Sequence, residues 1–435
     1  MNSVATALSF AFLSTERWDR VGLVDAGAQV LGTRRRWLSP LAREVLAAYP
    51  RRPADAPREL TAMIEGSDAL GQAITAARAR GASIRIHTYV VTPAEARPAP
   101  PVPRLDTITD LAALLHVPVA QLEWLADAKG MNRRAPAGPL HHYRYEWVAR
   151  PGRVPRLLEV PSDRLKRVQR VLLASVVGLL PVHDAAHGFV PGRSAVTGAA
   201  RHADNEVVIA LDLVTFFARV RAARVYGILR QAGLPEAVAY AITGLCTNRV
   251  PPRVLSAMPP GGSVEERFAL RQALTAGHLP QGAPTSPALA NLALRRLDAR
   301  LAGWAQAQDA TYTRYADDLA FSGDLRGADA FIRGVQRIVE DEGHSLNARK
   351  SRVRPAATRQ TVTGIVVNEH PNVPRREFDA LKAIIHNCVL QGPASQNRAG
   401  HGDFRAHLQG RISWVASLNP ERGAKLTREF RQIQW

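Results

Sequence analysis

Three aspartates, Asp212, Asp317 and Asp318, are the residues of this chain best suited to chemistry assisted by metal ions. Asp212 belongs to VVIALDL (residues 207–213), whose β-branched and aliphatic residues are typical of a buried strand. Asp317 and Asp318 form the turn of TYTRY-ADD-LAFS (residues 311–322), which indicates a second pair of strands. Hard divalent cations require carboxylate ligands, and two such ions about 4 Å apart can activate a hydroxyl and stabilise a phosphoryl group in transfer. The three carboxylates could therefore hold one pair of ions.

Each of these pieces alone also has an ordinary explanation. Paired aspartates are common in solvated turns, and an aspartate at a strand end is often only a cap. Asp212 and Asp317 lie 105 residues apart, so only tertiary structure can unite them. The chemical hypothesis depends on the elements that must bring the strand end and the turn together.

Composition favours a globular protein that binds nucleic acid. The 435 residues are 46% hydrophobic, enough for a sizeable core divided among two to four structural units. Lys and Arg number 57 against 38 Asp and Glu, and the formal net charge of +19 attracts polyanions. The longest apolar run, residues 171–182, is too short to span a bilayer, and the apolar opening, residues 1–13, lacks the basic residues and clear cleavage site of a signal peptide. We therefore expect a cytoplasmic protein with no membrane partner.

The two cysteines, Cys246 and Cys388, exclude a disulfide framework and a Cys-rich zinc site. Cys388 lies near His386, His401 and His407 in the sequence. Residues two apart on a helix point to different faces, however, so His386 and Cys388 make a poor ligand pair. We interpret these residues as parts of the core and the surface and not as a metal site.

The pattern along the chain predicts a helical start, a stiff linker and a longer remainder. Residues 1–92 are expected to be mainly helical, and residues 93–105, which contain five prolines, to form the linker. Residues 110–128 predict two short helices around a turn, an ordinary packing unit whose alternative is a DNA-reading helix-turn-helix. The remaining expectations are a helix capped by Ser162 with a basic outer face, a short strand at residues 362–367 and helices from about Phe378 onward.

Five segments occur in the order and rough spacing of the reverse transcriptases. They are HGFVPGRS (187–194), ALDLVTFFARV (210–220), LPQGAPTSPALANL (279–292), YADD (315–318) and EGHSLNARKS (342–351). The resemblance covers about residues 106–435 and is closest to the retron reverse transcriptases of bacteria, for which YADDLAFSG and VTGIVVN argue most.

The resemblance implies an α+β fold of the right-hand polymerase type behind an N-terminal helical extension. Residues 106–203 would form the fingers, and residues 204–368 the palm with part of the fingers. The palm would be an antiparallel sheet with helices on one side. Residues 369–435 would form an α-helical thumb. Its residues 375–431 carry ten Lys or Arg against five acids, and this thumb would grip an RNA or hybrid duplex by charge and shape.

The resemblance also assigns the metal site and the nucleotide pocket. Asp212, Asp317 and Asp318, with the backbone carbonyl of Leu213, would hold two Mg²⁺ ions, for which Mn²⁺ could substitute. Five residues would bind the incoming deoxynucleoside triphosphate (dNTP): Arg150 and Arg156 at its phosphates, Phe217 as a steric gate against a 2′ hydroxyl, and Gln281 and Gly282 near its sugar and base. The ordinary alternatives are solvated arginines, a core phenylalanine and a plain turn.

Two further assignments concern the later part of the chain. Lys350 would donate a proton to the departing pyrophosphate, although a lone lysine is usually just exposed. Val362, Thr363 and Gly364 match a triplet that retron enzymes use near their own structured RNA, and the alternative is an ordinary strand ending in glycine.

A retron-type enzyme would bind a cognate noncoding RNA, prime from an internal guanosine 2′ hydroxyl and copy part of that RNA into single-stranded DNA that stays linked to RNA. Its partners would be this RNA, the RNA/DNA hybrid, dNTPs and an effector or toxin protein, and its role would be defence against bacteriophage. The Asn-Ala-x-x-His signature of many retron enzymes is absent between Phe217 and Gln281. This absence leaves open a group II intron-like or other defence-associated bacterial reverse transcriptase. A non-catalytic RNA-binding relative is a further alternative, which the three intact aspartates oppose.

Overall fold

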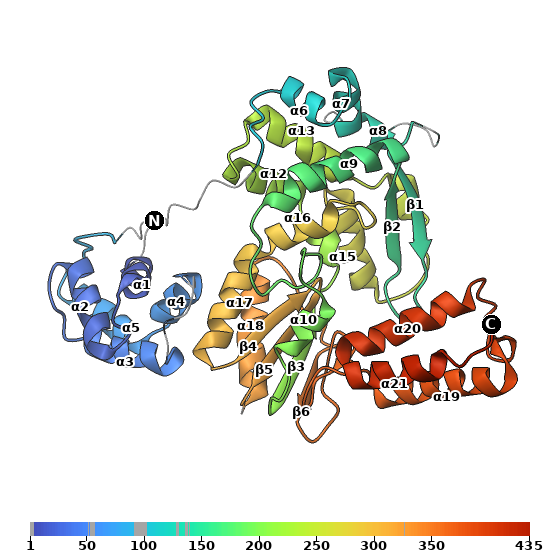
Figure 1. Ribbon diagram of the computed structural model, residues 1–435. Coiled ribbons are helices and arrows are strands. Elements are labelled where there is room, and N and C mark those ends of the chain that lie inside the picture. Colours follow the sequence, from blue (N-terminus) through green and yellow to red (C-terminus); the bar gives the residue numbers. More distant parts are fainter. Residues whose placement is uncertain are drawn as a thin grey trace.

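The computed structural model describes residues 4–50, 52, 57–90, 102–127, 130–134, 138, 140–325 and 327–435. They form a helical N-terminal unit, a larger central part that combines helices with antiparallel sheets, and a C-terminal set of helices (Figure 1). The predicted mixture of helices and antiparallel sheet is therefore confirmed. Most of the predicted linker, residues 93–101, lies outside the described residues.

The N-terminal unit is helical, as predicted, and has its own hydrophobic core, which includes Leu8, Phe12 and Leu41. Its helices are α1 (Val4–Ser14), α2 (Arg20–Leu31), α3 (Leu38–Ala48), α4 (Pro57–Glu65) and α5 (Asp68–Ala79). The unit contacts the central part where the ring of Tyr49 meets the ring of Trp304 edge to face, with centroids 6.3 Å apart. Residues 82–90, which follow these helices, form neither helix nor strand.

Helices and one β-hairpin form the part of the molecule at the top of Figure 1. They are α6 (Ile108–Leu114), α7 (Val119–Ala126), α8 (Met131–Arg134), β1 (Tyr143–Val148), β2 (Arg156–Pro161), α9 (Asp163–Ser175), η1 (Val177–Leu179), α12 (Ala222–Gln231), α13 (Glu236–Cys246), α14 (Pro252–Ser256), α15 (Val264–Thr275) and α16 (Ser286–Ala293). The predicted helix pair at residues 110–128 is present as α6 and α7, and both pack against α13 with Leu111 and Leu122 in the main core. Ser162 precedes α9 as predicted, but its side chain makes no capping hydrogen bond.

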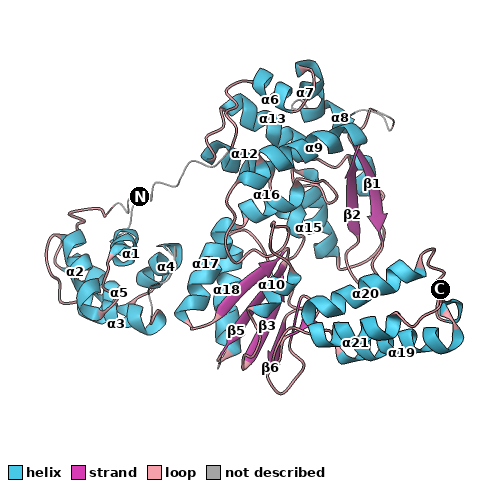
Figure 2. Ribbon diagram, viewed as in Figure 1, coloured by secondary structure: helices cyan, strands magenta, loops and turns pink. Residues whose placement is uncertain are grey.

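Four antiparallel strands form the central sheet, drawn in magenta in Figure 2 and labelled in Figure 1, in the order β4-β5-β3-β6. Their bounds are β3 (Val207–Asp212), β4 (Thr311–Tyr315), β5 (Asp318–Gly323) and β6 (Arg352–Pro355). β3 pairs with β5 on one side and β6 on the other, which suits its apolar, β-branched sequence. The strand predictions for residues 207–213 and 311–322 are confirmed.

The two faces of the sheet pack against different elements because side chains alternate along each strand. On one face, Ile209, Leu211 and Phe321 share the main core with α17 (Arg295–Ala307) and α18 (Ala328–Asp341). On the other face, Val208 and Ala320 belong to a separate core that includes residues of α10 (Ala195–Ala200) and of the C-terminal helices. The expectation of helices on one side of the sheet only was therefore wrong, because the second face also carries apolar residues, which α10 and the C-terminal helices bury.

Residues 361–366 form a tight hairpin and not the single strand expected at residues 362–367. β7 (Thr361–Val362) pairs with β8 (Ile365–Val366), and Thr363 and Gly364 between them have positive φ angles of 49° and 83°. Two successive positive φ angles reverse the chain in a two-residue turn. Helices follow as predicted: α19 (Arg375–Gln391), the short η2 (Pro393–Ser395), α20 (Phe404–Leu418) and α21 (Pro420–Phe430). Across the described ranges, the helices are all too short or too polar to traverse a membrane.

Candidate active site

Strand pairing places Asp212 and Asp318 opposite each other at one end of the central sheet. In the register of β3 and β5 the two residues are direct partners, so their side chains emerge on the same face. The Leu213 amide donates a hydrogen bond to the Asp317 carbonyl oxygen at 2.9 Å, which attaches the acidic turn to the end of β3. Folding thus unites the two acidic pieces of the sequence.

The Asp212 carboxylate is held by residues from a later loop. Asp212 is only 5% exposed. Lys350 Nζ donates to its Oδ1, and Asn347 Nδ2 lies 3.4 Å from its Oδ2. The Asn347 amide also donates to the Asp212 carbonyl oxygen at 2.8 Å. Lys350 therefore lies inside the site, and its role as a proton donor remains a prediction. Asn347 was missed, because no local pattern pairs it with a residue 135 positions earlier.

Burial and neighbouring charges raise the pKa values of the two turn carboxylates. The pKa of Asp318 is raised to about 6, mainly by burial and then by the charges of Asp317 and Asp212. Burial is also the main cause that raises the pKa of Asp317, and the charge of Asp212 adds to it, while Lys350 acts in the opposite direction. Carboxylates that disfavour one another's charge in this way are stabilised by a cation among them.

The carboxylates are chemically suited to divalent metal ions, although they are not arranged in a complete coordination geometry. Among the residues that the structure describes, no three His, Cys, Asp or Glu side chains converge as metal ligands do, and the Asp212 carboxylate is engaged by Lys350 instead. The three carboxylates at this end of the sheet are nevertheless the hard oxygen donors that Mg²⁺ prefers. Asp212, Asp317 and Asp318 would hold it, and the part of the Leu213 carbonyl remains a prediction.

Arg150 and Arg156 flank the loop of the β1–β2 hairpin and lie within electrostatic reach of the acidic residues. The pKa of Arg150 is lowered, mainly by burial and then by the charges of Arg156 and Arg153. The charges of Asp212 and Asp317 act to raise it. Arg156 in turn acts to lower the pKa of Asp317. Cations within electrostatic reach of carboxylates suit a triphosphate that contacts the arginines directly and the carboxylates through metal ions.

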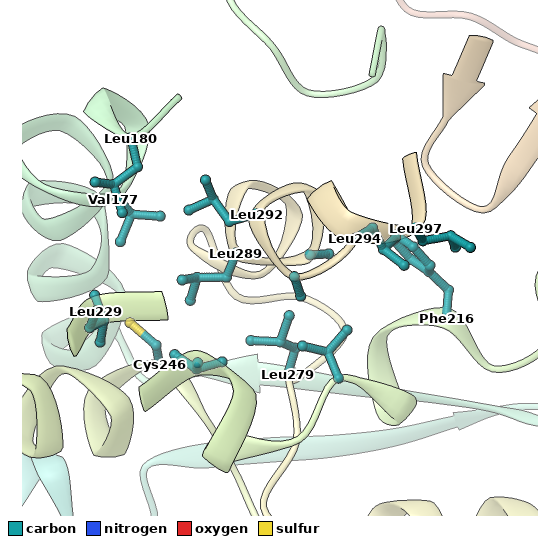
Figure 3. Packing of buried hydrophobic residues seen from close by; sticks show 14 of the residues in the cluster. Val177, Leu180, Phe216, Leu229, Cys246, Leu279, Leu289, Leu292, Leu294 and Leu297 are labelled. Carbon is teal, nitrogen blue, oxygen red and sulfur yellow. The ribbon is translucent and has the colours of Figure 1, made fainter. Parts of the chain in front are cut away.

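Phe217 lies at the rim of the main core. It belongs to the short helix α11 (Phe216–Arg219), which follows a left-handed residue, Thr215, with a φ of 50°. Phe216 is buried and points toward Leu294 and Leu297 (Figure 3), whereas Phe217 is half-buried and packs edge-on against Phe216 with centroids 4.9 Å apart. Of the two phenylalanines, Phe216 is thus the core residue, and the gate role of Phe217 remains a prediction.

The loop that carries Gln281 and Gly282 is fastened to the β1–β2 hairpin. The Gln281 carbonyl oxygen accepts a hydrogen bond from the Glu159 amide at 2.8 Å. Gly282 has a φ of 131°, and a Cβ there would lie 2.9 Å from the Glu159 carbonyl oxygen. Glycine therefore lets the loop approach the protein's own strand, a requirement that the sequence did not reveal.

A buried ion pair joins the same two segments. His278 and Glu159 are 0% and 1% exposed, and His278 Nε2 lies 2.9 Å from Glu159 Oε1. His278 Nδ1 lies 2.8 Å from the Ala276 carbonyl oxygen, so both ring nitrogens face acceptors. Asn248 Nδ2 donates to the other Glu159 oxygen at 2.7 Å. Burial alone would lower the pKa of His278, but the charge and hydrogen bond of Glu159 outweigh it and raise the pKa above its ordinary value.

This ion pair makes stability depend on pH. A histidine whose pKa is raised by folding stabilises the protein fully below the ordinary pKa of about 6.5, and the contribution is lost as pH rises through the raised value. We expect the unmodified protein to have a higher free energy of unfolding than His278→Gln. This difference should be larger at about pH 6 than at about pH 9, by about 1 kcal/mol. Urea unfolding at both pH values measures this difference, and a difference independent of pH would contradict the charged pair.

A pocket of about 480 Å³ connects the acidic site with the β7–β8 turn. Asp318 and Tyr315 line one part of it, and the predicted triplet Val362, Thr363 and Gly364 lines another. Three basic residues at alternating positions, Lys350, Arg352 and Arg354, also line this pocket. The alternation of basic residues in KSRVR is the sequence signal that could have identified Arg352 and Arg354, since alternate residues of a strand share a face.

Comparison with known proteins identifies the class to which this fold and site belong. The family model described as "Reverse transcriptase (RNA-dependent DNA polymerase)" matches residues 150–367, a span that contains the acidic site, Arg150 and Arg156. The chain is an RNA-directed DNA polymerase of the reverse transcriptase family.

Its curated relatives define the branch. The chain is 41% identical over 330 residues to the retron Mx65 reverse transcriptase of Myxococcus xanthus, covering 74% of this chain and 70% of the relative. It is 33% identical over 348 residues to the retron Mx162 reverse transcriptase of the same organism, covering 76% and 67%. It is 26% identical over 288 residues to the retron Ec86 reverse transcriptase of Escherichia coli, covering 65% and 79%. The chain therefore belongs to the retron reverse transcriptases, although it lacks the Asn-Ala-x-x-His signature.

Proposed function

We propose that this retron reverse transcriptase extends DNA by nucleotidyl transfer with two Mg²⁺ ions held by Asp212, Asp317 and Asp318. The observation that carries the proposal is the register of β3 and β5, which puts Asp212 opposite Asp318 with Asp317 next to it in the turn. When bound, the two ions would supply activation of the 3′ hydroxyl and neutralisation of charge on the phosphate. Mn²⁺ would fit the same oxygen donors.

The chain's own residues bind and orient the nucleotide. The guanidinium groups of Arg150 and Arg156 grip the triphosphate, to which their planar forks are suited. The ring of Phe217 lies under the sugar and excludes a 2′ hydroxyl, and Gln281 hydrogen-bonds near the same sugar. Lys350, which is 36% exposed and already donates to Asp212, gives a proton to the departing pyrophosphate.

The template in this proposal is a cognate structured noncoding RNA. Priming occurs at the 2′ hydroxyl of an internal guanosine, and the product is single-stranded DNA linked to RNA. Residues 106–203 act as fingers, residues 204–368 as the palm with part of the fingers, and residues 369–435 as a basic thumb on the hybrid duplex. Val362, Thr363 and Gly364 contact the RNA from the pocket beside Asp318. The setting is the cytoplasm, and the biological role is defence against bacteriophage together with an effector or toxin protein.

The RNA-linked product gives this proposal a direct test. The purified protein, incubated with the noncoding RNA encoded beside its gene, Mg²⁺ and dNTPs, is expected to form DNA that migrates with RNA on a denaturing gel and shortens after ribonuclease treatment. A generic primed RNA template serves as the control for polymerase activity. Synthesis on the generic template with no RNA-linked product from the neighbouring RNA would contradict the proposed template and priming.

A further inference from the structure

The acidic turn lies above a fully buried ion pair that has no part in the proposed chemistry. Arg314 of β4 and Asp298 of α17 are both 0% exposed. Arg314 Nε and Nη2 each lie 2.7 Å from a different oxygen of the Asp298 carboxylate, and the Tyr312 hydroxyl donates to the same carboxylate at 2.9 Å. Burying two charges costs free energy that their attraction often fails to recover. Stability alone is therefore a weak explanation for this pair.

The remaining nitrogen of Arg314 reaches the catalytic turn itself. Nη1 donates to the Ala316 carbonyl oxygen at 3.0 Å and to Asn291 Oδ1 at 2.9 Å. Ala316 immediately precedes Asp317, and its φ of 56° lies in the left-handed region that residues with a Cβ rarely adopt. A guanidinium fixed by Asp298 thus holds the residue that sets the direction of the turn.

A second segment, the loop ahead of α10, supports the same turn. The Asn291 side-chain amide donates to the Gly188 carbonyl oxygen at 2.8 Å, and the His187 amide donates to the Arg314 carbonyl oxygen at 2.8 Å. A Cβ at Gly188 would lie 2.7 Å from the Ala316 nitrogen, so this loop and the turn are in direct contact. Asn291 joins the loop to Arg314, and the turn is held by both.

We propose that Arg314 is a positioning residue for DNA synthesis, whose guanidinium, oriented by Asp298, holds the Ala316 carbonyl and thereby aims Asp317 and Asp318. This inference rests on the proposed role of the two aspartates as metal ligands. The planar guanidinium donates to three groups at once from a fixed geometry. A lysine in its place keeps the charge beside Asp298 but cannot make all three contacts, because its ammonium is a single point.

A matched pair of variants, Arg314→Lys and Arg300→Lys, tests the positioning role. Arg300 is also buried, at 2% exposed, and it pairs with Asp341 and Glu342 at the C-terminal end of α18, at 2.8 and 2.7 Å. With the full chain, a primed RNA template and dNTPs, the measurements are kcat, the KM for dNTP, the Mg²⁺ concentration that gives half-maximal rate, and the unfolding midpoint. For Arg314→Lys we expect kcat to fall about 100-fold and the half-saturating Mg²⁺ concentration to rise. The KM for dNTP stays within about twofold. For Arg300→Lys we expect kcat, the KM for dNTP and the half-saturating Mg²⁺ concentration to stay unchanged. Its unfolding midpoint should fall about as much as that of Arg314→Lys.

Three outcomes decide the matter. Equal kcat and Mg²⁺ dependence in Arg314→Lys and Arg300→Lys would overturn the positioning role. If Arg314→Lys does not fold, Asn291→Ala carries the test, since it keeps the ion pair and removes the link between the loop and Arg314. We then expect kcat to fall about tenfold with a raised Mg²⁺ requirement, and unchanged values would overturn the role.

Asp317→Ala in the same assay separates the two proposals: if it is active, the metal site itself is refuted. If it is inactive while Arg314→Lys is normal, only the positioning role fails.

Discussion

Replacement of Asp317 by alanine is expected to reduce DNA synthesis by about 10³-fold or more, because one of the three carboxylates proposed to hold the metal pair is removed. Affinity for the RNA should stay within about twofold of the unmodified protein, since the site's carboxylates repel phosphates and the basic surfaces that attract RNA are unchanged. Primer extension at saturating Mg²⁺ and a filter-binding titration at fixed salt measure the two effects.

Asp329→Ala is the matched control for this experiment. Asp329 is an exposed carboxylate in the first turn of α18, on the helix that follows β5, and it has no part in the site. Its removal should leave the rate of synthesis near that of the unmodified protein. Substantial synthesis by Asp317→Ala would remove this residue from the catalytic site, and a joint loss of RNA binding would indicate that the substitution damages the fold.

Replacement of Phe217 by alanine is expected to admit ribonucleotides. The change removes the ring that would meet a 2′ hydroxyl, so the preference for deoxyribonucleotides, measured as the ratio of kcat/KM values for dNTP and rNTP, should fall about 100-fold. Most of the change should lie in the values for rNTP. Single-nucleotide incorporation with each substrate measures the ratio.

Phe268→Ala provides the comparison for the gate. Phe268 is a phenylalanine of α15 that is 61% exposed, so its removal changes the same chemical group outside the site. Its discrimination ratio should equal that of the unmodified protein. Should Phe217→Ala keep full discrimination while remaining folded and active, another residue must form the gate.

Much of the sheet and of the acidic site could be predicted because their signals are local. The β-branched run that ends at Asp212 and the alternating strands around Asp317 and Asp318 are short patterns that the pairing of β3 with β5 preserves. Helical spacing likewise identified the C-terminal helices from Phe378 onward. The order of the motifs then supplied what no single pattern could, namely that the pieces belong to one site.

The contacts that complete the site were not predictable, because they join residues that are distant in the sequence. The sequence around Arg314 predicts only a residue of a strand, and nothing near it in the sequence indicates a buried partner on α17. Lys350 was assigned from its motif, yet its contact with Asp212 depends on how one loop closes. The turn at Gly364 was missed for another reason: the apolar run around it reads as one strand, and a positive φ leaves little trace in composition.

The buried polar residues around the site share a structural role. Arg314 of β4, paired with Asp298 of α17, donates to the Ala316 carbonyl oxygen in the acidic turn. The pair of Glu159 and His278 joins the β1–β2 hairpin to the loop of Gln281. Both pairs connect separate segments that meet at the nucleotide in the proposed function. A fully satisfied buried network rigidifies such a junction.

The shared metal site is tested most directly by anomalous diffraction from crystals that contain the protein, Mn²⁺, a primed RNA template and a non-hydrolysable dNTP analogue. We expect two manganese peaks about 4 Å apart, with ligands from Asp212, Asp317 and Asp318, and Lys350 displaced from the Asp212 carboxylate. Manganese bound elsewhere, with Asp212 and Asp318 free of metal in the presence of the nucleotide, would contradict the account.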